Sequence, residues 1–478
     1  MSILVLFVLV AYFVILMFIS HCVAKGKQEN NESFFMAGRN ASWQIVAIGM
    51  VGASVSGVSF LSVPGMVSGI GFQYLQMALG FILGYILIAK ILLPVYYGFT
   101  KFSIYEYIKK RFGYNAYKTS ACFFLVSKLC ATAAKVYVIV LVLYSFAFAP
   151  LGVSFFTSTL IIVGMIWFYT RNGGLNTIVW TDMLQTVFMV LSLILIICSF
   201  VYKLGLDFYG LIDLTLNSPW SKYVEWENWA SKQHFVKQFF SGAFIALVMT
   251  GLDQDMIQKN RAIGSLRQSQ KNMYWYGSAF VPLNFLFLLL GLLMLQYASV
   301  HGIDLPARGD EYLTFFVTNG TFGFFVSACF VVGVVSATFS SADSSLTSLT
   351  TSFCVDIANE KSDVRFRKWV HVSFCILLVA VIDVIREYDD KSLIDLIYVM
   401  VSYSYGPLLG LFSFGLLTHR KTSDRAVPFI AILSPVVCFC FDLWCKNALT
   451  YELGYELLML NGVMTFVGLW LFSSKKCQ

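Results

Sequence analysis

The stretch SATFSSADSSLTSLTTS (Ser336 to Ser352) lies inside an apolar run that extends from Phe324 to Val355. It carries eleven hydroxyl side chains and one carboxylate, that of Asp343. Because lipid offers no hydrogen-bond partners, so many polar groups must face a protein interior or a wet cavity. On a helix, one stripe would hold Ala337, Ser340, Ser341, Ser344, Ser345 and Ser348.

The chemistry of this stripe points to a small cation. Hydroxyl and carbonyl oxygens with few carboxylates suit a hard monovalent cation, since a transition metal would favour His or Cys ligands. The alternative is a face of small residues that lets helices pack closely in a membrane. The segment alone leaves both interpretations open, and the rest of the chain favours ion binding.

The composition of the whole chain is that of a membrane protein. Of its 478 residues, 58% are hydrophobic and 12% are charged, which is about half the charged share of an average soluble chain. Apolar runs long enough to cross a bilayer, ~20 residues each, recur along the whole sequence. A transmembrane barrel would show alternating segments of about ten residues instead. We therefore expect an all-α polytopic protein in the lipid bilayer, with residues 1–478 as a single transmembrane domain.

Hydropathy and loop signals predict about thirteen transmembrane helices. The first apolar run, Ile3 to Val23, lacks a basic leader region and a cleavage motif, so we expect a retained helix. The expected centres of the helices lie near Val10, Ser56, Leu83, Leu129, Val163, Val190, Ala246, Phe287, Ser340, Leu377, Leu408, Ser434 and Phe466.

The distribution of basic residues predicts the orientation. With the N-terminus outside and the C-terminus in the cytoplasm, the inner loops hold twenty-two of the 33 Lys and Arg residues and the outer loops eight. Cytoplasmic loops of membrane proteins carry such an excess. The net charge of +7 therefore reflects topology in a cell (plasma or inner) membrane, and it gives no indication of nucleic-acid binding.

The second predicted helix is interrupted. The run GASVSGVSFLSVPG (Gly52 to Gly65) contains three glycines, four serines and one proline. Freed backbone groups at membrane depth are tolerated only where a cavity or a ligand satisfies them, and broken helices near the midplane expose such groups in many secondary transporters. The alternative is a helix that is merely kinked and tightly packed.

Besides Asp343, three charged residues within predicted spans need an explanation. Asp182, in the inner third of the sixth helix, is a functional candidate by position or a cap at the start of that helix. Lys128 and Lys135 lie seven residues apart on one face of the fourth helix, and Lys128 is close enough to an end to snorkel. Lys135 lies deeper. It either neutralises a buried carboxylate or meets an anionic substrate, and the sequence leaves these alternatives equal.

A further charged cluster lies on the predicted inner loop from Gly251 to Asn260. It contains Asp253, Asp255 and Lys259. Such clusters are mostly solvated loop surface, which is the interpretation we favour here; a role in gating is the alternative.

Several function classes leave no trace in the sequence. The chain lacks a Gly-rich phosphate loop with Lys-Ser/Thr, and it lacks HExxH and GxSxG signatures. It also lacks a filter-like TVGYG run. We therefore expect neither an ATP-driven pump, nor an enzyme, nor a potassium channel, and no obligate protein partner is evident.

Four segments resemble motifs of one known family. They are YEYIKKRFG (Tyr105 to Gly113), YTRNGGL (Tyr169 to Leu175) followed by Thr181, Asp182 and Gln185, the stretch Ala337 to Thr351, and YGPLLGL (Tyr405 to Leu411). In this order and spacing the chain resembles the sodium:solute symporter family, which includes sodium-coupled sialic acid, proline and galactose transporters. The resemblance runs over essentially the whole chain.

The resemblance implies a LeuT-like fold of two inverted five-helix repeats plus extra helices. The repeats would cover about residues 41–203 and 234–418, with flanking helices at 3–23, 425–446 and 455–473. A co-transported sodium ion would bind between the broken second helix and the ninth helix. Its implied ligands are the carbonyls of Gly52, Val55 and Ala337 and the hydroxyls of Ser340 and Ser341.

A second sodium site is implied by some sialic acid transporters of the family. The corresponding positions here are Asp182, Ser340, Asp343 and Ser344. The family pattern has a serine where this chain has Asp343. That departure either strengthens a cation site or, by protonation, abolishes it.

The resemblance also bears on the substrate. In the sialic acid branch a basic residue midway along the fourth helix meets the substrate carboxylate, and Lys135 lies near that position. This predicts an organic anion, such as a sialic acid or a monocarboxylate, carried into the cell by sodium-driven symport with alternating access. The expected substrate residues are Ser56, Ser59, Phe72, Gln76 and Lys135. The alternatives are a proton-coupled carrier that uses Asp182 or Asp343, and a non-transporting membrane sensor on the same fold.

Overall fold

The computed structural model describes residues 2–24, 41–99, 103–320, 323–359, 363–387, 393–449 and 451–474. In this part of the chain eight helices are long and apolar enough to cross a membrane, and up to ten if each of two bent helix pairs counts as one span. Three shorter apolar helices lie at Phe7–Ile19, Phe155–Thr170 and Leu457–Leu471. The predicted all-α class and the multiple spans are confirmed.

The elements follow one another with few long connections. The longest helices are α9 (Tyr114–Leu143), α10 (Phe155–Lys203), α14 (Leu266–His301) and α16 (Phe324–Ser352). The others are α1 (Ser2–Ala24), α3 (Trp43–Ser54), α4 (Gly57–Gly65), α5 (Val67–Ile70), α6 (Tyr74–Leu87), η2 (Ile88–Leu92), α7 (Leu93–Tyr97), α8 (Glu106–Arg111), η3 (Tyr144–Phe148), η4 (Ala149–Leu151), α11 (Phe208–Asn217), α12 (Phe235–Ala246), η5 (Leu247–Gly251), α13 (Gln254–Arg261), η6 (Gly309–Glu311), α15 (Tyr312–Thr318), η7 (Phe353–Ile357), α17 (Val364–Glu387), α18 (Leu393–Leu417), α19 (Val427–Leu449) and α20 (Leu457–Leu471). The two-residue strands β1 (Lys421–Thr422) and β2 (Ser473–Ser474) pair antiparallel.

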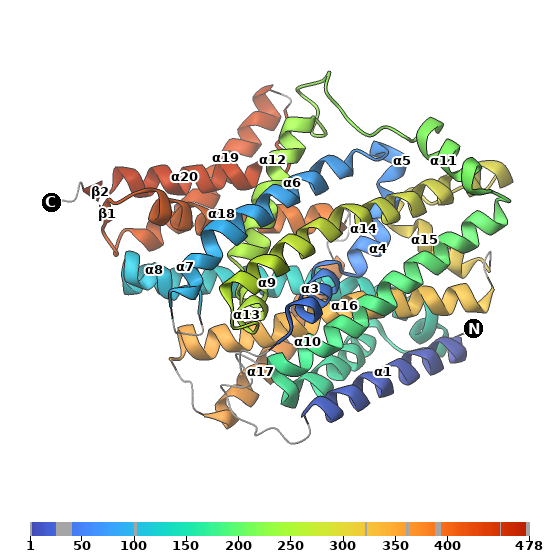
Figure 1. Cartoon of the computed structure of the whole chain (residues 1–478), viewed down its shortest axis with the longest axis horizontal. Helices are drawn as coiled ribbons and strands as arrows, with labels where there is room; N and C mark the ends of the chain where they lie inside the picture. The colour runs from blue at the N-terminus through green and yellow to red at the C-terminus, as the bar shows by residue number, and fades with distance from the viewer. Residues whose placement is uncertain are drawn as a thin grey trace.

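The hydroxyl-rich helix α16 lies in the middle of the molecule, with α1 along one edge and α19 and α20 at the opposite end (Figure 1). It packs against α3, α4, α9, α10 and α17. Every residue from Gly333 to Ser352 is buried. The polar stripe is therefore enclosed by protein, as its composition predicts.

The predicted interruption of the second helix is confirmed. Helix α3 and the segment that begins with α4 meet at an angle of 60°, and Val55 and Ser56 between them have extended backbone. Gly57 makes the close approach to α16 possible, because an added Cβ would lie 2.4 Å from the Oγ1 atom of Thr338. The break thus lies directly against the hydroxyl-rich helix.

A second bent pair was not predicted. The segment 235–251 (α12 and η5) and helix α13 meet at 65°. The expectation of a solvated loop over Gly251 to Asn260 is wrong, because every residue of α13 is buried. Asp253 caps this short helix by accepting a hydrogen bond from the amide of Asp255 (2.9 Å).

Helix α10 also differs from expectation. The sequence predicts two separate helices, centred near Val163 and Val190, whereas the backbone is helical from Phe155 to Lys203. A straight helix of these 49 residues would be ~74 Å long, more than twice the bilayer core. The neighbours Tyr12 and Phe13 on α1 pack against Phe188 and Tyr169, respectively. The two halves of α10 therefore lie side by side, as two predicted helices would.

Candidate functional site

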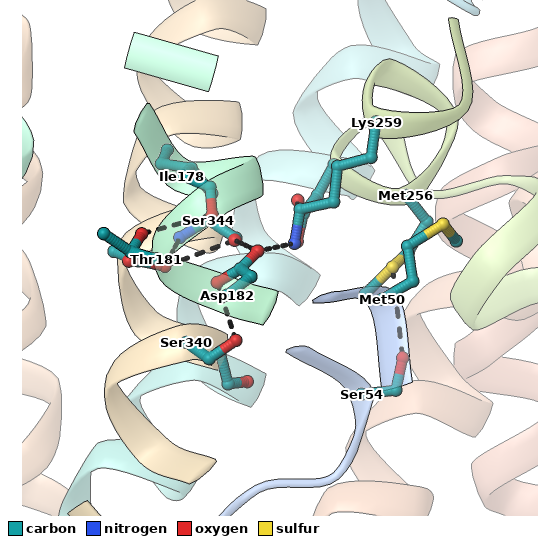
Figure 2. Close-up of polar contacts among 12 residues, drawn as sticks. Met50, Ser54, Ile178, Thr181, Asp182, Met256, Lys259, Ser340 and Ser344 are labelled. Atoms are coloured by element: carbon teal, nitrogen blue, oxygen red, sulfur yellow. Dashed lines mark hydrogen bonds and ion pairs between the residues drawn. The ribbon is translucent and has the colours of Figure 1, made fainter. Parts of the chain in front are cut away.

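The carboxylate of Asp182 on α10 connects three helices. Its Oδ2 atom lies 2.8 Å from the Nζ atom of Lys259 on α13. From α16, the hydroxyl of Ser340 donates to Oδ1 (2.6 Å) and that of Ser344 donates to Oδ2 (3.2 Å). Figure 2 shows the carboxylate between the lysine and the two serines. Asp182 is fully buried, so it does not cap the start of a helix at the membrane interface.

The neighbouring carboxylate of Asp343 has neutral partners. Its Oδ2 atom accepts a hydrogen bond from the Tyr169 hydroxyl (2.9 Å), and its Oδ1 atom accepts from the amide and the hydroxyl of Ser344. Ser344 therefore bridges Asp182 and Asp343. Among the described residues, no lysine or arginine forms an ion pair with Asp343.

Lys135 reaches from α9 to the hydroxyl-rich helix. Its Nζ atom donates to the Ser341 hydroxyl (3.1 Å), and it also lines an internal cavity. Within the described ranges it forms no ion pair. Lys259, and not Lys135, is the residue that neutralises Asp182.

Lys128, two helical turns from Lys135 on the same face of α9, does not snorkel to an interface. It is buried, and its Nζ atom pairs with the Oδ2 atoms of Asp253 (2.9 Å) and Asp255 (3.0 Å). The hydroxyl of Tyr405 on α18 donates to Asp253 (3.0 Å). These contacts tie α9 and α18 to the break between η5 and α13.

The cavity lies beside the break in the second helix and has a volume of about 110 Å³. Val55, Ser56 and Ser59 from the break contribute to its wall, as does Ser345 from α16. The remaining wall includes Lys135, Tyr74, Tyr398, Asp253 and Tyr405.

Two hydrogen bonds, called the two ties below, connect α18 to other parts of the cavity wall. Tyr398 shares a hydrogen bond with Tyr74 of α6 (2.9 Å), and Tyr405 donates to Asp253. Seven residues separate the two tyrosines, which corresponds to ~10 Å along a helix. The two ties therefore lie at different depths of the same cavity.

The expected carbonyl ligands lie at the break. The amide of Val55 bonds back to Val51 (3.0 Å), so Gly52 belongs to the last turn of α3, where carbonyls lack partners within the helix. The amide of Ser59 bonds to the Ser56 carbonyl (2.9 Å) instead of that of Val55. Ala337, Ser340 and Ser341 are buried on the facing helix α16.

Two expected substrate residues lie elsewhere. Phe72 packs against Tyr223 and Phe285. Gln76 donates to the Gln233 carbonyl (2.9 Å) and accepts from the Glu225 amide (3.1 Å). Neither residue is part of the cavity wall. Both instead hold the segment between α11 and α12 against the bundle, whereas Ser56, Ser59 and Lys135 do line the cavity.

Sequence reasoning missed the roles of Lys259, Tyr169 and Tyr405. The signal for Lys259 was its spacing of four residues from Asp255, which places both on one helical face. The spacing is informative only if Asp255 and Lys259 lie on a helix, whereas the charge content of this segment indicated a loop. Tyr169 and Tyr405 stood in quoted motifs, but nothing in the sequence paired them with Asp343 and Asp253.

Known proteins of one family are similar to this chain over most of its length. The model of the sodium:solute symporter family matches residues 34–428. The chain is 24% identical over 478 aligned residues to the sodium/glucose cotransporter of Vibrio parahaemolyticus, covering 93% of this chain and 86% of that protein. It is 22% identical to the sodium/sialic acid symporter NanT of Aliivibrio fischeri, over 88% of this chain and 84% of that one.

A solved structure has the same fold. It is the substrate-bound, outward-open state of a Na⁺-coupled sialic acid symporter, with a TM-score of 0.84 at 17% identity. The match covers 98% of this chain and 99% of that chain.

Proposed function

Because the chain belongs to the sodium:solute symporter family, as the match over residues 34–428 demonstrates, we propose that this sodium-driven symporter carries a small organic anion into the cell. Its relatives are transporters of solutes as different as glucose and sialic acid. The substrate must therefore be argued from the cavity.

The observation that favours an anionic substrate is the environment of the Lys135 ammonium group. Two other buried ammonium groups have carboxylate partners: Lys128 pairs with Asp253 and Asp255, and Lys259 pairs with Asp182. Lys135 faces the cavity, and among the described residues its one hydrogen-bond partner is the Ser341 hydroxyl. A partly buried charge without a counter-charge is costly. A substrate carboxylate would supply that counter-charge through a charge-assisted hydrogen bond.

The sodium ion is proposed to bind between the break and α16. The carbonyls of Gly52 and Val55 are released from helical hydrogen bonding by the break. Ala337, Ser340 and Ser341 would complete the set from the facing helix. Five oxygens of this kind suit a hard monovalent cation, and bridging the two helices lets ion binding favour one conformation.

The wider architecture is proposed to contain thirteen spans in two inverted repeats. Eight long helices, two bent pairs and three shorter apolar helices are the segments available. The bent pairs begin near residues 43 and 235, at the start of the proposed repeats 41–203 and 234–418. A broken first helix in each repeat is what an inverted-repeat transporter requires. The excess of basic residues on one side supports an outer N-terminus and an inner C-terminus in a cell membrane.

Proton coupling is the second candidate, and Asp343 favours it. The buried carboxylates of this region outnumber its ammonium groups by one: Asp182, Asp253, Asp255 and Asp343 against Lys128, Lys135 and Lys259. Asp343 is the carboxylate without an ion pair among the described residues. A sodium ion shared with Asp182 and Ser344, or a proton on Asp343, would balance the charge.

The test is sodium-dependent binding of matched acids and neutral analogues to the purified protein. L-Lactate would be compared with L-lactamide, and N-acetylneuraminate with its methyl ester, by thermal stability in sodium and in potassium. We expect at least one acid to stabilise the protein in sodium while its neutral analogue does not, because the analogue lacks the counter-charge for Lys135. Stabilisation by neutral analogues with no response to the acids contradicts an anionic substrate.

A further inference from the structure

Lys135 contacts a residue of the proposed sodium site. Its Nζ atom lies 3.1 Å from the Ser341 hydroxyl oxygen. An ammonium group has only donors, so the hydroxyl oxygen accepts this hydrogen bond with a lone pair. A sodium ion at Ser341 would need a lone pair of the same oxygen. It would also lie next to a second positive charge.

Among Lys128, Lys135 and Lys259, Lys135 is the lysine best able to move. Two carboxylates hold Lys128, and one holds Lys259 at 2.8 Å. A charge-assisted pair of this kind is stronger than a bond to a neutral hydroxyl. Lys135 is also on the cavity wall together with Ser56 and Ser59. Its ammonium can therefore exchange Ser341 for a group inside the cavity without leaving the site.

We propose that Lys135 is a built-in competitor of sodium, which an anionic substrate removes. In the substrate-free protein the ammonium bonds to Ser341 and weakens sodium binding there. A carboxylate in the cavity draws the ammonium toward itself and leaves Ser341 free for sodium. This inference rests on the proposed function, and it assigns the coupling between anion and sodium to one side chain.

The coupling has a definite sign. An anion that withdraws Lys135 raises the sodium affinity, and sodium at Ser341 raises the anion affinity by the same factor. Typical couplings change affinity about five- to 150-fold. Removing the ammonium should therefore give the tighter sodium binding without any anion, and should abolish the effect of the anion.

The experiment is a sodium titration of thermal stability in detergent, with choline chloride keeping the ionic strength constant. The variants are Lys135→Met and Lys135→Gln, with Lys203→Met, an exposed lysine at the end of α10, as the control for loss of one charge. Without anion, we expect the half-saturating sodium concentration to fall at least about fivefold in both Lys135 variants. The control should keep the wild-type value.

A Ser341→Ala background tests whether Lys135 acts through that hydroxyl. In this background, Lys135→Met should lower the half-saturating sodium concentration by clearly less than it does with Ser341 present, because only the nearby charge, and no longer the hydrogen bond, is removed. A carboxylate probe, N-acetylneuraminate or L-lactate, that lowers this concentration in wild type should lose its effect in Lys135→Met.

Unchanged or weaker sodium binding in both Lys135 variants overturns the proposal that Lys135 exchanges Ser341 for the anion. So does an equal effect of the carboxylate in wild type and in Lys135→Met. These results leave the proposed function standing as long as wild type itself responds to sodium. A wild-type protein without a sodium-specific response refutes the sodium site itself, and the exchange with it.

Discussion

Lys259 and Asp182 form a fully buried ion pair, with 2.8 Å between Nζ and Oδ2. The pair joins the short helix α13 to α10, and through Ser340 and Ser344 it reaches α16. Asp182 was expected to hold a second sodium ion. Here an ammonium group of the chain itself takes one of its oxygens, so any ion at this carboxylate must share it with Lys259.

Lys259→Met should destabilise the protein by about 3–5 kcal/mol, because it leaves the buried charge of Asp182 without its partner. The double variant Lys259→Met with Asp182→Asn should recover much of this loss, since it removes both charges. The measurement is the free energy of unfolding, or the melting temperature, of the purified protein.

Lys232→Met provides the control for that experiment. The Lys232–Glu452 ion pair is exposed on both sides, with 47% of the lysine side chain and 59% of the glutamate side chain accessible. Exposed pairs contribute about 0–1 kcal/mol. A loss of stability as large at Lys232 as at Lys259, or no recovery in the double variant, would show that burial of the charge is not the cause.

Ser340→Ala and Ser341→Ala should each raise the sodium concentration for half-maximal uptake by about tenfold, which corresponds to ~1.4 kcal/mol. Each substitution removes one proposed oxygen ligand. Uptake into proteoliposomes at a fixed substrate concentration measures the change. Ser348→Ala is the control on the same stripe, because the Ser348 hydroxyl bonds the Ser345 carbonyl within α16 (2.9 Å). Wild-type sodium dependence in both Ser340 and Ser341 variants would reject this site.

Asp343→Asn separates sodium from proton coupling. Asparagine keeps an oxygen for the Tyr169 hydroxyl and removes the charge that lacks an ion pair. For a sodium-driven carrier we expect uptake to remain sodium-dependent, with half-saturation changed by less than about fivefold. The proton-coupled alternative would be favoured if a proton gradient drives uptake by the wild-type protein without sodium and if Asp343→Asn abolishes that uptake.

Gly57→Ala should be destabilising by about 1–3 kcal/mol, the usual range for overpacking. The added Cβ would lie 2.4 Å from the Thr338 Oγ1 atom, and Thr338→Ala should restore most of the loss. Gly164→Ala is the control, since its Cβ would meet nothing within 4 Å and alanine favours a helix interior. Melting temperatures of the purified variants test this. Equal effects at Gly57 and Gly164 would show that contact with α16 is not the cause.

The sequence was sufficient where composition alone determines structure. Glycines and Pro64 within an apolar run predicted the broken helix, and the density of hydroxyl groups predicted that α16 is enclosed by protein. Both arguments rest on polar groups for which lipid offers no hydrogen-bond partner, so they need no knowledge of neighbouring helices.

The rest depends on tertiary partners. Asp253 and Asp255 resemble a solvated loop until Lys128, 125 residues away from Asp253 in the sequence, is known to pair with them. Phe72 and Gln76 lie four residues apart in the sequence, and this spacing gives no information about the segment between α11 and α12 that covers them. The partner of Asp182 was missed for the same reason: Lys259 lies in the part expected to be a loop.

The two ties on α18 have a consequence for the efficiency of the carrier. A membrane pore open at both ends would let sodium leak and waste the gradient. Tyr398 and Tyr405 both belong to α18, so a rigid-body movement of this helix displaces both hydroxyl groups together. The contacts at the two depths of the cavity are therefore not independent, and a carrier that moves α18 alters both of them in the same step.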